Sequence, residues 1–370
     1  MLEWKKLGEI ANLVRGKVIS KDYIRDHEGL YSVYSSQTAN DGILGCIDSY
    51  MFDGDFLTWT TDGAYAGTIF RRKGKFNITN VCGLVDLTDK QVNQDFLYYW
   101  LSFVAKDYVN EGMGNPKLMS NVASTIRIPV PSLSEQTRIV GILDTFTASI
   151  ENLKQQIAQR RKQYEHYRDQ LLDLEGKEGV EMKRLKEVFD TRNGYTPSTT
   201  NSLFWEGGTI PWFKMEDIRD NGRILNDSNL HITPRAIKGK GLFKSNSIIL
   251  ATSATIGEHA LITVDHLCNQ RFTNFFPKKD YMAKIDMKFI YYYMFIIDEW
   301  CRQHINQGGF ASVDMIGLYN LFIPIPSLAE QQRIVSILDT FETSIANLEQ
   351  QLAQRERQYE YYRNKLLTFE

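Results

Sequence analysis

The stretch Ile128-Pro-Val-Pro-Ser-Leu-Ser-Glu-Gln-Thr-Arg-Ile-Val140 occurs a second time in this 370-residue chain, as Ile323-Pro-Ile-Pro-Ser-Leu-Ala-Glu-Gln-Gln-Arg-Ile-Val335. Aligned over 45 residues from these two starting points, the copies share 31 identical positions. A weaker similarity upstream pairs residues 96–101 with residues 289–294. An internal repeat of this length predicts two copies of one structural plan, with diverged bodies and nearly identical tails.

Each tail opens with the start signal of a helix. Ser132 and Glu135 form a capping box, in which the serine hydroxyl accepts a first-turn N–H and the glutamate reaches back to the serine amide. Ser327 and Glu330 repeat the pattern in the second copy. Each serine follows a proline, which cannot continue a helix backwards.

Apolar residues then recur at alternating spacings of four and three, the heptad pattern of a coiled coil. The pattern predicts two long helices, 132–175 and 327–370, that pack against each other along one seam. Arg160 and Arg355 interrupt the seam at equivalent places, where we expect their stems to cover it. The alternative is that they specify the register or form part of the docking surface for partner helices. The predicted seam residues are Ile139, Leu143, Phe146, Ile150, Leu153, Ile157 and Tyr164 in the first helix, and Ile334, Leu338, Phe341, Ile345, Leu348, Leu352 and Tyr359 in the second.

The order of segments along the chain predicts that the two helices run antiparallel. The second body leaves the end of the first helix and enters the start of the second through short linkers. A helix of about 42 residues is roughly 60 Å long, whereas a body of about 150 residues has a radius of gyration near ~15 Å. Only an antiparallel pair brings both attachment points of that body together.

The bodies combine short β-type runs, polar loops and one aromatic-rich helix. Candidate strands are residues 55–60, 67–70 and 246–252, each flanked by turn residues. We therefore expect an α+β fold, in which two small domains, 1–131 and 176–326, are held apart by the long antiparallel helices and related by a pseudo-two-fold axis.

Composition indicates an ordinary globular protein of the cytoplasm. Its four cysteines form no CxxC pair and are expected to be reduced thiols. Its start lacks the apolar stretch of a secretory signal. Its apolar runs are shorter than the ~18 residues that a membrane span needs, so we expect no membrane association and no metal site.

Further motifs connect this plan to a known family. Two variable bodies, each followed by a nearly identical capped helix, resemble the specificity subunits of type I restriction–modification enzymes over the whole chain. In the first body the supporting motifs are Val33-Tyr-Ser-Ser-Gln-Thr-Ala-Asn-Asp-Gly and Thr58-Trp-Thr-Thr-Asp-Gly-Ala-Tyr-Ala-Gly-Thr. In the second they are Gly194-Tyr-Thr-Pro-Ser, Trp205-Glu-Gly-Gly-Thr-Ile-Pro-Trp212, Ala251-Thr-Ser-Ala-Thr-Ile-Gly and Cys268-Asn-Gln.

The resemblance implies a DNA-binding subunit that is not itself an enzyme. Each variable domain would recognise one half of a split target in double-stranded DNA, and the helix pair would set the gap between the halves. Two adenine methyltransferase subunits would dock on the helices, and two motor-nuclease subunits can join. S-adenosylmethionine is expected in the methyltransferase partner and no cofactor in this subunit. In agreement, the chain has no GxxxxGK[ST] or HExxH motif.

Candidate DNA contacts are polar side chains in or beside the loops, together with the basic run from Arg71 to Lys75. Amides and arginines can recognise base edges, and lysines and arginines can fix phosphates. For each amide the simpler role of bracing its own turn stays open, as does a solvated hairpin for the basic run. The predicted contacts are Gln37, Asn40, Thr61, Tyr65, Arg71, Arg72, Lys73, Lys75, Lys117, Lys214, Ser253, Thr255, Asn269, Gln270, Arg271, Asn274 and Gln307.

Charge leaves a second hypothesis open. Residues 1–131 contain 14 basic and 15 acidic side chains, and residues 175–322 contain 18 and 17. Because phosphate neutralisation dominates non-specific DNA affinity, we expect the chain alone to bind DNA weakly and its partners to supply much of the phosphate clamp. The alternative function is a coiled-coil adaptor whose two α+β heads bind protein or carbohydrate. A self-sufficient nuclease or methylase ranks last, because its catalytic motifs are missing.

Overall fold

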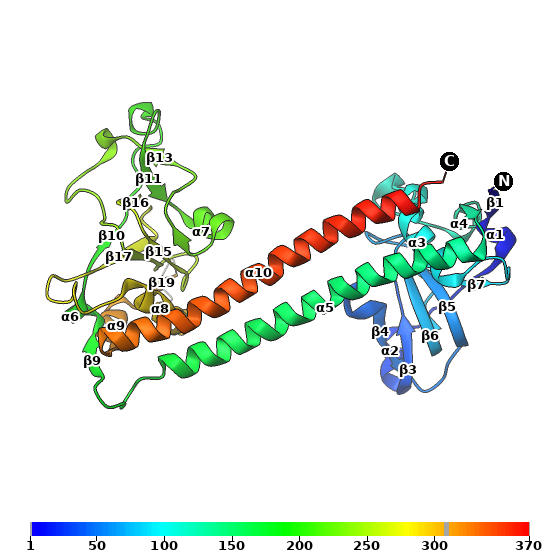
Figure 1. The fold of residues 1–370 in the computed structure, drawn as a ribbon, viewed down its shortest axis with the longest axis horizontal. Helices are drawn as coiled ribbons and strands as arrows, with labels where there is room; N and C mark the ends of the chain where they lie inside the picture. Colours follow the sequence, from blue (N-terminus) through cyan, green and yellow to red (C-terminus); the bar gives the residue numbers. More distant parts are fainter. Residues whose placement is uncertain (1, 307–310, 370) are drawn as a thin grey trace. The chain divides into compact units, whose positions relative to one another are not determined.

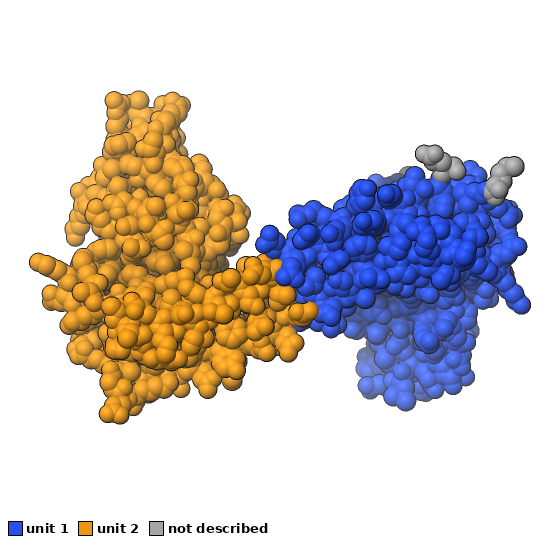
Figure 2. Space-filling view, in the orientation of Figure 1, with its two compact units in different colours: residues 1–155, 349–370 blue, residues 156–348 orange. Residues whose placement is uncertain are grey.

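The computed structural model describes residues 2–306 and 311–369. The chain forms two compact units, which are coloured separately in Figure 2: unit 1 consists of residues 1–155 and 349–370, and unit 2 of residues 156–348. Each unit therefore contains one α+β body and a part of each long helix (Figure 1). The predicted α+β fold with an internal repeat is confirmed.

Unit 1 is built on a six-stranded sheet in which β3 and β6 run parallel and all other neighbours antiparallel. The aromatic helix α3 (Gln94–Val104) packs on it, and Phe96, Leu97 and Trp100 share a buried cluster with Trp59. In sheet order the strands are β2 (Ala11–Arg15), β7 (Cys82–Leu87), β5 (Phe52–Thr60), β6 (Ile69–Ile78), β3 (Glu28–Tyr34) and β4 (Ile43–Ile47). The remaining elements are the paired strands β1 (Glu3–Lys6) and β8 (Arg127–Val130), helices α1 (Leu7–Ile10), α2 (Lys21–Asp26) and α4 (Ser120–Ala123), and the 3-10 turns η1 (Ala39–Gly42), η2 (Ala105–Tyr108) and η3 (Gly112–Gly114).

Unit 2 repeats this plan with a second aromatic helix, α8 (Met287–Gln303), on a five-stranded sheet. That sheet has the order β10 (Phe189–Asn193), β17 (Phe272–Pro277), β14 (Ser247–Ala251), β15 (His259–Ile262) and β12 (Ile224–Leu225). A three-stranded sheet has the order β13 (His231–Ile232), β11 (Ile210–Phe213) and β16 (Leu267–Cys268). The other elements are the pairs β9 (Glu181–Arg184) with β20 (Phe322–Ile325) and β18 (Ile305–Asn306) with β19 (Ser312–Val313), helices α6 (Leu185–Val188), α7 (Met215–Asn221) and α9 (Met315–Asn320), and turns η4 (Ser202–Phe204) and η5 (Pro234–Ala236).

The long helices are α5 (Leu133–Leu172) and α10 (Leu328–Leu366). The serine half of each predicted cap is confirmed: the amide of Glu135 donates to Ser132 Oγ and that of Glu330 to Ser327 Oγ, both at 3.3 Å. The glutamate half differs. Each carboxylate instead forms a two-point ion pair with the arginine three residues further along, at 2.7 and 2.8 Å in both copies, because a bidentate guanidinium is a stronger partner than a single amide.

A buried glutamine ties the start of each long helix to the aromatic helix of the same unit. Gln136 Nε2 donates to two main-chain carbonyls, both at 2.8 Å, and its Oε1 accepts from the amide of Asn93 (2.7 Å), the N-cap of α3. Gln331 repeats all three bonds, and its Oε1 accepts from Asp286 (2.9 Å), the N-cap of α8. Both glutamines are fully buried. The glutamine of each repeated Glu-Gln therefore connects the long helix to the aromatic helix of the same unit.

Within each unit the two helices run antiparallel, as expected, since rising residue numbers in α5 meet falling numbers in α10. None of the predicted seam side chains is exposed. Arg160 lies 5.9 Å from the ring of Phe341, and Arg355 lies 5.6 Å from that of Phe146, so both seam arginines lie close to an aromatic ring. Contacting pairs are Phe146–Tyr362 and Lys154–Glu356 in unit 1, and Tyr164–Glu342 and Tyr167–Phe341 in unit 2.

Candidate nucleic-acid interface

Four segments of unit 1 converge where β2 and β5 end and β7 begins. The amide of Thr61 donates to Val81 O (3.0 Å), that of Leu118 to Thr61 O (2.9 Å), and that of Gly16 to Cys82 O (3.3 Å). We call this region loop cluster 1; its segments are residues 15–17, 60–62, 78–82 and 117–118.

Unit 2 builds the same arrangement at the matching strand ends, where β10 and β14 end and β17 begins. The amide of Thr252 donates to Arg271 O (3.0 Å), that of Val313 to Thr252 O (2.9 Å), and that of Gly194 to Phe272 O (3.0 Å). We call this region loop cluster 2; its segments are residues 193–196, 251–253, 268–272 and 312–313.

One glycine in each cluster permits a close approach of two main chains. A Cβ on Gly16 would lie 2.2 Å from Ile78 O and 2.3 Å from Thr79 O. A Cβ on Gly194 would lie 2.2 Å from both Cys268 O and Asn269 O. Neither space can hold a side chain, so the glycine is a requirement of this geometry. This equivalence was not predicted from the sequence, although a glycine follows the β2 and β10 segments at the same offset.

The side chains on this shared backbone differ between the clusters. In cluster 1, Asp62 lies 3.7 Å from Arg15 and 3.6 Å from Lys117, so charged groups dominate. In cluster 2, Thr196 Oγ1 donates to Gln270 Oε1 (2.5 Å), and the exposed Arg271 is the one charged side chain of its segments. The two clusters share one backbone arrangement but carry different polar groups. Each is therefore suited to bind a surface with its own pattern of hydrogen-bond donors and acceptors.

Three predicted contact residues of unit 1 lie in or beside cluster 1, but Thr61 is buried and holds Arg15 instead (3.2 Å). Tyr65 is 57% exposed and Lys117 is exposed. Gln37 donates its side-chain amide to Ile43 O and so braces its own turn, the simpler role left open above. Asn40 is exposed in η1 with φ of 49°.

The basic run of unit 1 is mostly engaged within the protein. Arg72 is 3% exposed, forms an ion pair with Asp41 (2.7 Å) and stacks on Tyr34, so it supports the fold and has no surface left for a phosphate. Arg71 pairs with Asp95 (2.8 Å). Lys73 lies 3.7 Å from Asp55, and Lys75 lies over the ring of Tyr50.

In unit 2 the structure brings most of the predicted contacts together. Ser253, Asn269, Gln270 and Arg271 lie in loop cluster 2, and Thr255 follows within the same loop. The Asn269 side chain accepts from the amide of Arg271 (3.0 Å) and stabilises its turn. Asn274, by contrast, is 3% exposed inside β17 and donates to Ser247 Oγ, so it is an internal residue. Lys214 lies outside the cluster as the N-cap of α7, and Gln307 lies outside the described residues.

A second basic segment, residues 235–244, was not among the predicted contacts; it contains Arg235, Lys238, Lys240 and Lys244. From Ser228 to Gly257 the chain has no acidic residue. This basic segment could have been found in the sequence, but the net charge of the whole body, which is close to zero, gave no sign of it.

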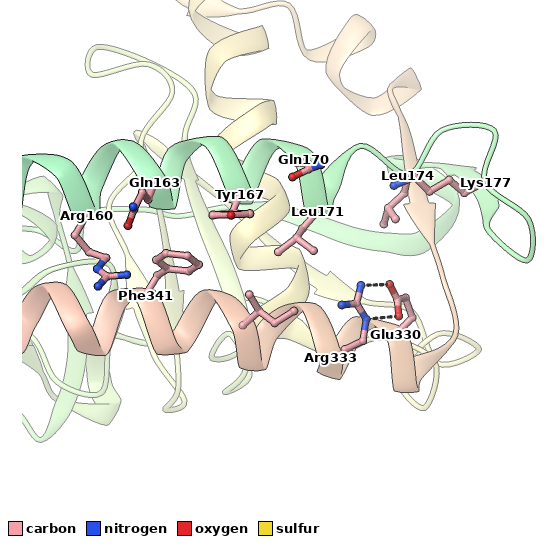
Figure 3. Close-up of a pocket in the computed structure, with 11 residues that line it drawn as sticks. Arg160, Gln163, Tyr167, Gln170, Leu171, Leu174, Lys177, Glu330, Arg333 and Phe341 are labelled. Carbon is pink, nitrogen blue, oxygen red and sulfur yellow. Dashed lines mark hydrogen bonds and ion pairs between the residues drawn. The ribbon is translucent and has the colours of Figure 1, made fainter.

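A groove lies between the helices in unit 2, close to the end of α5 (Figure 3). Its volume is about 770 Å³, and Tyr167, Leu171 and Phe341 give it an apolar floor beside Arg160 and the Glu330–Arg333 ion pair.

Two other features do not occur in the part of the chain that the structure describes. Within residues 2–306 and 311–369, no group of three or more His, Cys, Asp or Glu side chains is placed to hold a metal ion. In the same ranges no helix combines the length and apolar character needed to cross a membrane.

Comparison with known proteins identifies the family. The family described as "Type I restriction modification DNA specificity domain" matches residues 1–160 and 177–357. The chain therefore belongs to this family, in agreement with the resemblance carried by its repeats.

Individual relatives agree with this assignment. The specificity subunit of the Escherichia coli type I restriction enzyme EcoR124I/EcoR124II is 36% identical, over 100% of this chain and 94% of that protein. The specificity subunit of the E. coli type I restriction enzyme EcoprrI is 50% identical, but over only 55% of this chain and 53% of that protein. The S subunit of a type I restriction-modification system from M. genitalium shares the fold, with a TM-score of 0.62, 15% identity and coverage of 100% of this chain and 97% of that one.

Proposed function

We propose that this chain is the sequence-specific DNA-binding subunit of a type I restriction–modification complex. The observation that carries the proposal is the pair of loop clusters: two units present the same backbone frame, at the same strand ends, with different polar side chains. Together with the family assignment, this supports two recognition domains, each contacting one half of a bipartite target. Arg15, Lys117 and Tyr65 are the exposed or partly exposed candidates in unit 1, and Gln270 and Arg271 those in unit 2.

The long helices have two roles in this proposal. Each helix is continuous from one unit into the other, so its length sets the gap between the two half-sites. The groove beside Tyr167 and Phe341 forms part of the surface on which adenine methyltransferase subunits dock. Those partners would bind S-adenosylmethionine and carry out the methylation, and motor-nuclease subunits can join them. The chain itself would catalyse no step.

The test is single-molecule sequencing of N6-methyladenine in host DNA, with and without this gene. We expect the deletion to abolish methylation at one split motif, two short half-sites around a fixed gap. Removing one heptad from each helix, residues 153–159 and 348–354, is expected to shorten that gap. Unchanged methylation after deletion would contradict the proposal and favour the adaptor function.

A further inference from the structure

The basic segment 235–244 lies beside loop cluster 2. The Tyr195 hydroxyl donates to Ala236 O (3.0 Å) and accepts from the amide of Lys238 (2.8 Å). Tyr195 directly follows Gly194 of the cluster, and its own amide donates to Cys268 O (2.8 Å). One side chain therefore fastens the segment to the recognition loops.

A second anchor holds the other end of the segment. Arg192 of β10 donates to Gly241 O (2.7 Å) and lies over the ring of Phe243 at 4.1 Å. Arg192 and Phe243 also line a hollow of about 380 Å³, together with Lys240, Lys244 and Asp190. These anchors bond main-chain atoms of the segment, so they occupy none of its lysine side chains.

The charges of this segment are available for a partner. Arg235, Lys238, Lys240 and Lys244 are all exposed. Among the ion pairs of the described residues, only Lys244 takes part, with Asp265 at 2.9 Å. Gly239 and Gly241 have positive φ, 58° and 78°, and a Cβ at either position would have no atom within 4 Å. The bare backbone beside the lysines can therefore approach a flat or convex polyanion closely.

We infer that residues 235–244 form a phosphate-contacting arm of the second recognition domain, which contacts the DNA backbone next to the bases that loop cluster 2 recognises. The inference rests on the proposed function. It names the ligand of this surface as the sugar-phosphate backbone, because spaced ammonium groups without hydrogen-bond acceptors suit phosphates and carry no base specificity. It also places part of the phosphate clamp on this chain, in contrast to the hypothesis that partners supply most of it.

The experiment compares two double variants of the full chain, each of which removes two positive charges. Lys238→Gln with Lys240→Gln alters the arm. Lys279→Gln with Lys284→Gln is the matched control, because both lysines are exposed and follow Pro277, the end of β17 opposite to loop cluster 2. Affinity for a duplex of random sequence, about four helical turns long, is measured by fluorescence anisotropy over a range of salt concentrations, from about 50 to about 200 mM.

We expect the wild type and the control to share one slope of log affinity against log salt concentration. The arm variant should have a slope less negative by about 0.9 for each phosphate that it no longer neutralises, roughly 2 in total, with correspondingly weaker binding at low salt. Equal slopes for the two double variants, with the wild type binding normally, would overturn the arm but leave the proposed function standing. Failure of the wild type to bind any duplex at the lowest salt concentration would overturn the arm, whereas the proposed function is overturned by unchanged methylation after deletion of the gene.

A sequence-specific readout separates phosphate contact from base recognition. On duplexes that contain the methylated motif, the arm variant should lose affinity for matched and mismatched duplexes by the same factor, since backbone contacts do not discriminate between bases. A selective loss for the matched duplex would assign the two lysines to base recognition and overturn the backbone assignment.

Discussion

The basic run of unit 1, residues 71–75, and the basic segment of unit 2, residues 235–244, each contain four cations, but their surroundings differ. In unit 1 three of the four form ion pairs with carboxylates of the same unit, whereas in unit 2 only one of the four forms an ion pair among the described residues. The difference shows that the number of charges in a run does not determine how many are available to a partner. What determines it is whether carboxylates of the same fold lie beside the run, here Asp55 of β5, Asp95 of α3 and Asp41 of η1.

The pairing of β5 with β6 accounts for one of these three ion pairs, that of Lys73. β5 and β6 pair antiparallel, with Asp53 opposite Lys75, Gly54 opposite Gly74 and Asp55 opposite Lys73. Opposite charges across an antiparallel pair stabilise the sheet by a few tenths of a kcal/mol, up to ~1 kcal/mol. Only the pair of Lys73 with Asp55 is a cross-strand ion pair, whereas Arg71 and Arg72 pair with Asp95 of α3 and Asp41 of η1. The segment 235–244 has one antiparallel bridge, between Phe243 and His266, with Asp265 beside it, and it is otherwise held by Tyr195 and Arg192.

The two units share the close approach of main chains at Gly16 and Gly194, and the largest predicted effect tests this shared geometry. Gly16→Ala and Gly194→Ala each force a Cβ to within 2.3 Å of main-chain oxygens. We expect each to destabilise its own unit by roughly 3–4 kcal/mol, from overpacking and the loss of the adjoining hydrogen bonds. Hydrogen exchange of the strands in each unit measures the effect separately.

Gly141→Ala is the control for this pair. Gly141 lies in α5 with no atom near its Cβ position, so alanine should raise stability by up to ~1 kcal/mol through its helix propensity. If Gly16→Ala destabilised unit 1 and Gly194→Ala left unit 2 unchanged, the two clusters would not share one backbone requirement.

Part of this structure was accessible from the sequence, and part was not. The two long helices could be predicted, because both copies carry the heptad pattern and share 31 identical residues of 45. The role of Gln136 could not be predicted, because two of its three partners are main-chain atoms near the start of α3, distant in the sequence, which no local pattern specifies. The burial of Arg72 could not be predicted for the same reason. Its partner Asp41 is 31 residues away in the sequence and comes close only because of the order of strands in the sheet.

The second prediction, of intermediate size, tests whether Arg72 is a support and not a DNA contact. Arg72→Met removes the ion pair with Asp41 and the hydrogen bond to Thr58 Oγ1 (3.3 Å) inside the domain. We expect unit 1 to lose about 2 kcal/mol, because a charge-assisted bond is broken while the exposed Asp41 can return to water. Lys73→Met, at a side chain that is 87% exposed, should change stability by less than ~0.5 kcal/mol. If Arg72→Met altered the salt dependence of DNA binding without a loss of stability, the supporting role would be refuted.

The smallest predicted effect comes from a place where the repeated helices differ. In both units a tyrosine hydroxyl donates to an aspartate of the long helix at 2.6 Å, Tyr99 to Asp144 and Tyr292 to Asp339. In unit 2 the Tyr292 hydroxyl also lies 3.0 Å from the carboxylate of Glu342, whereas the corresponding residue of unit 1 is Thr147. Burial raises the pKa of Glu342, and the hydrogen bonds from Tyr292 and Tyr164 only partly oppose this.

The sign of the pH effect follows from that raised pKa. In the unfolded chain a glutamate titrates near ~4.3, so below this pH both states are protonated and Glu342 costs nothing. As pH rises through the higher folded-state pKa, the folded unit must lose a proton that it binds more tightly than the unfolded chain does, and stability falls. Glu342→Gln should therefore equal the wild type near pH ~4 and exceed it by up to ~1 kcal/mol at pH ~7, measured by hydrogen exchange in unit 2. The reciprocal change, Thr147→Glu, should give unit 1 the same pH-dependent loss. If the stability difference between Glu342→Gln and the wild type did not vary with pH, packing and not ionisation would distinguish the tyrosine–aspartate contacts of the two units.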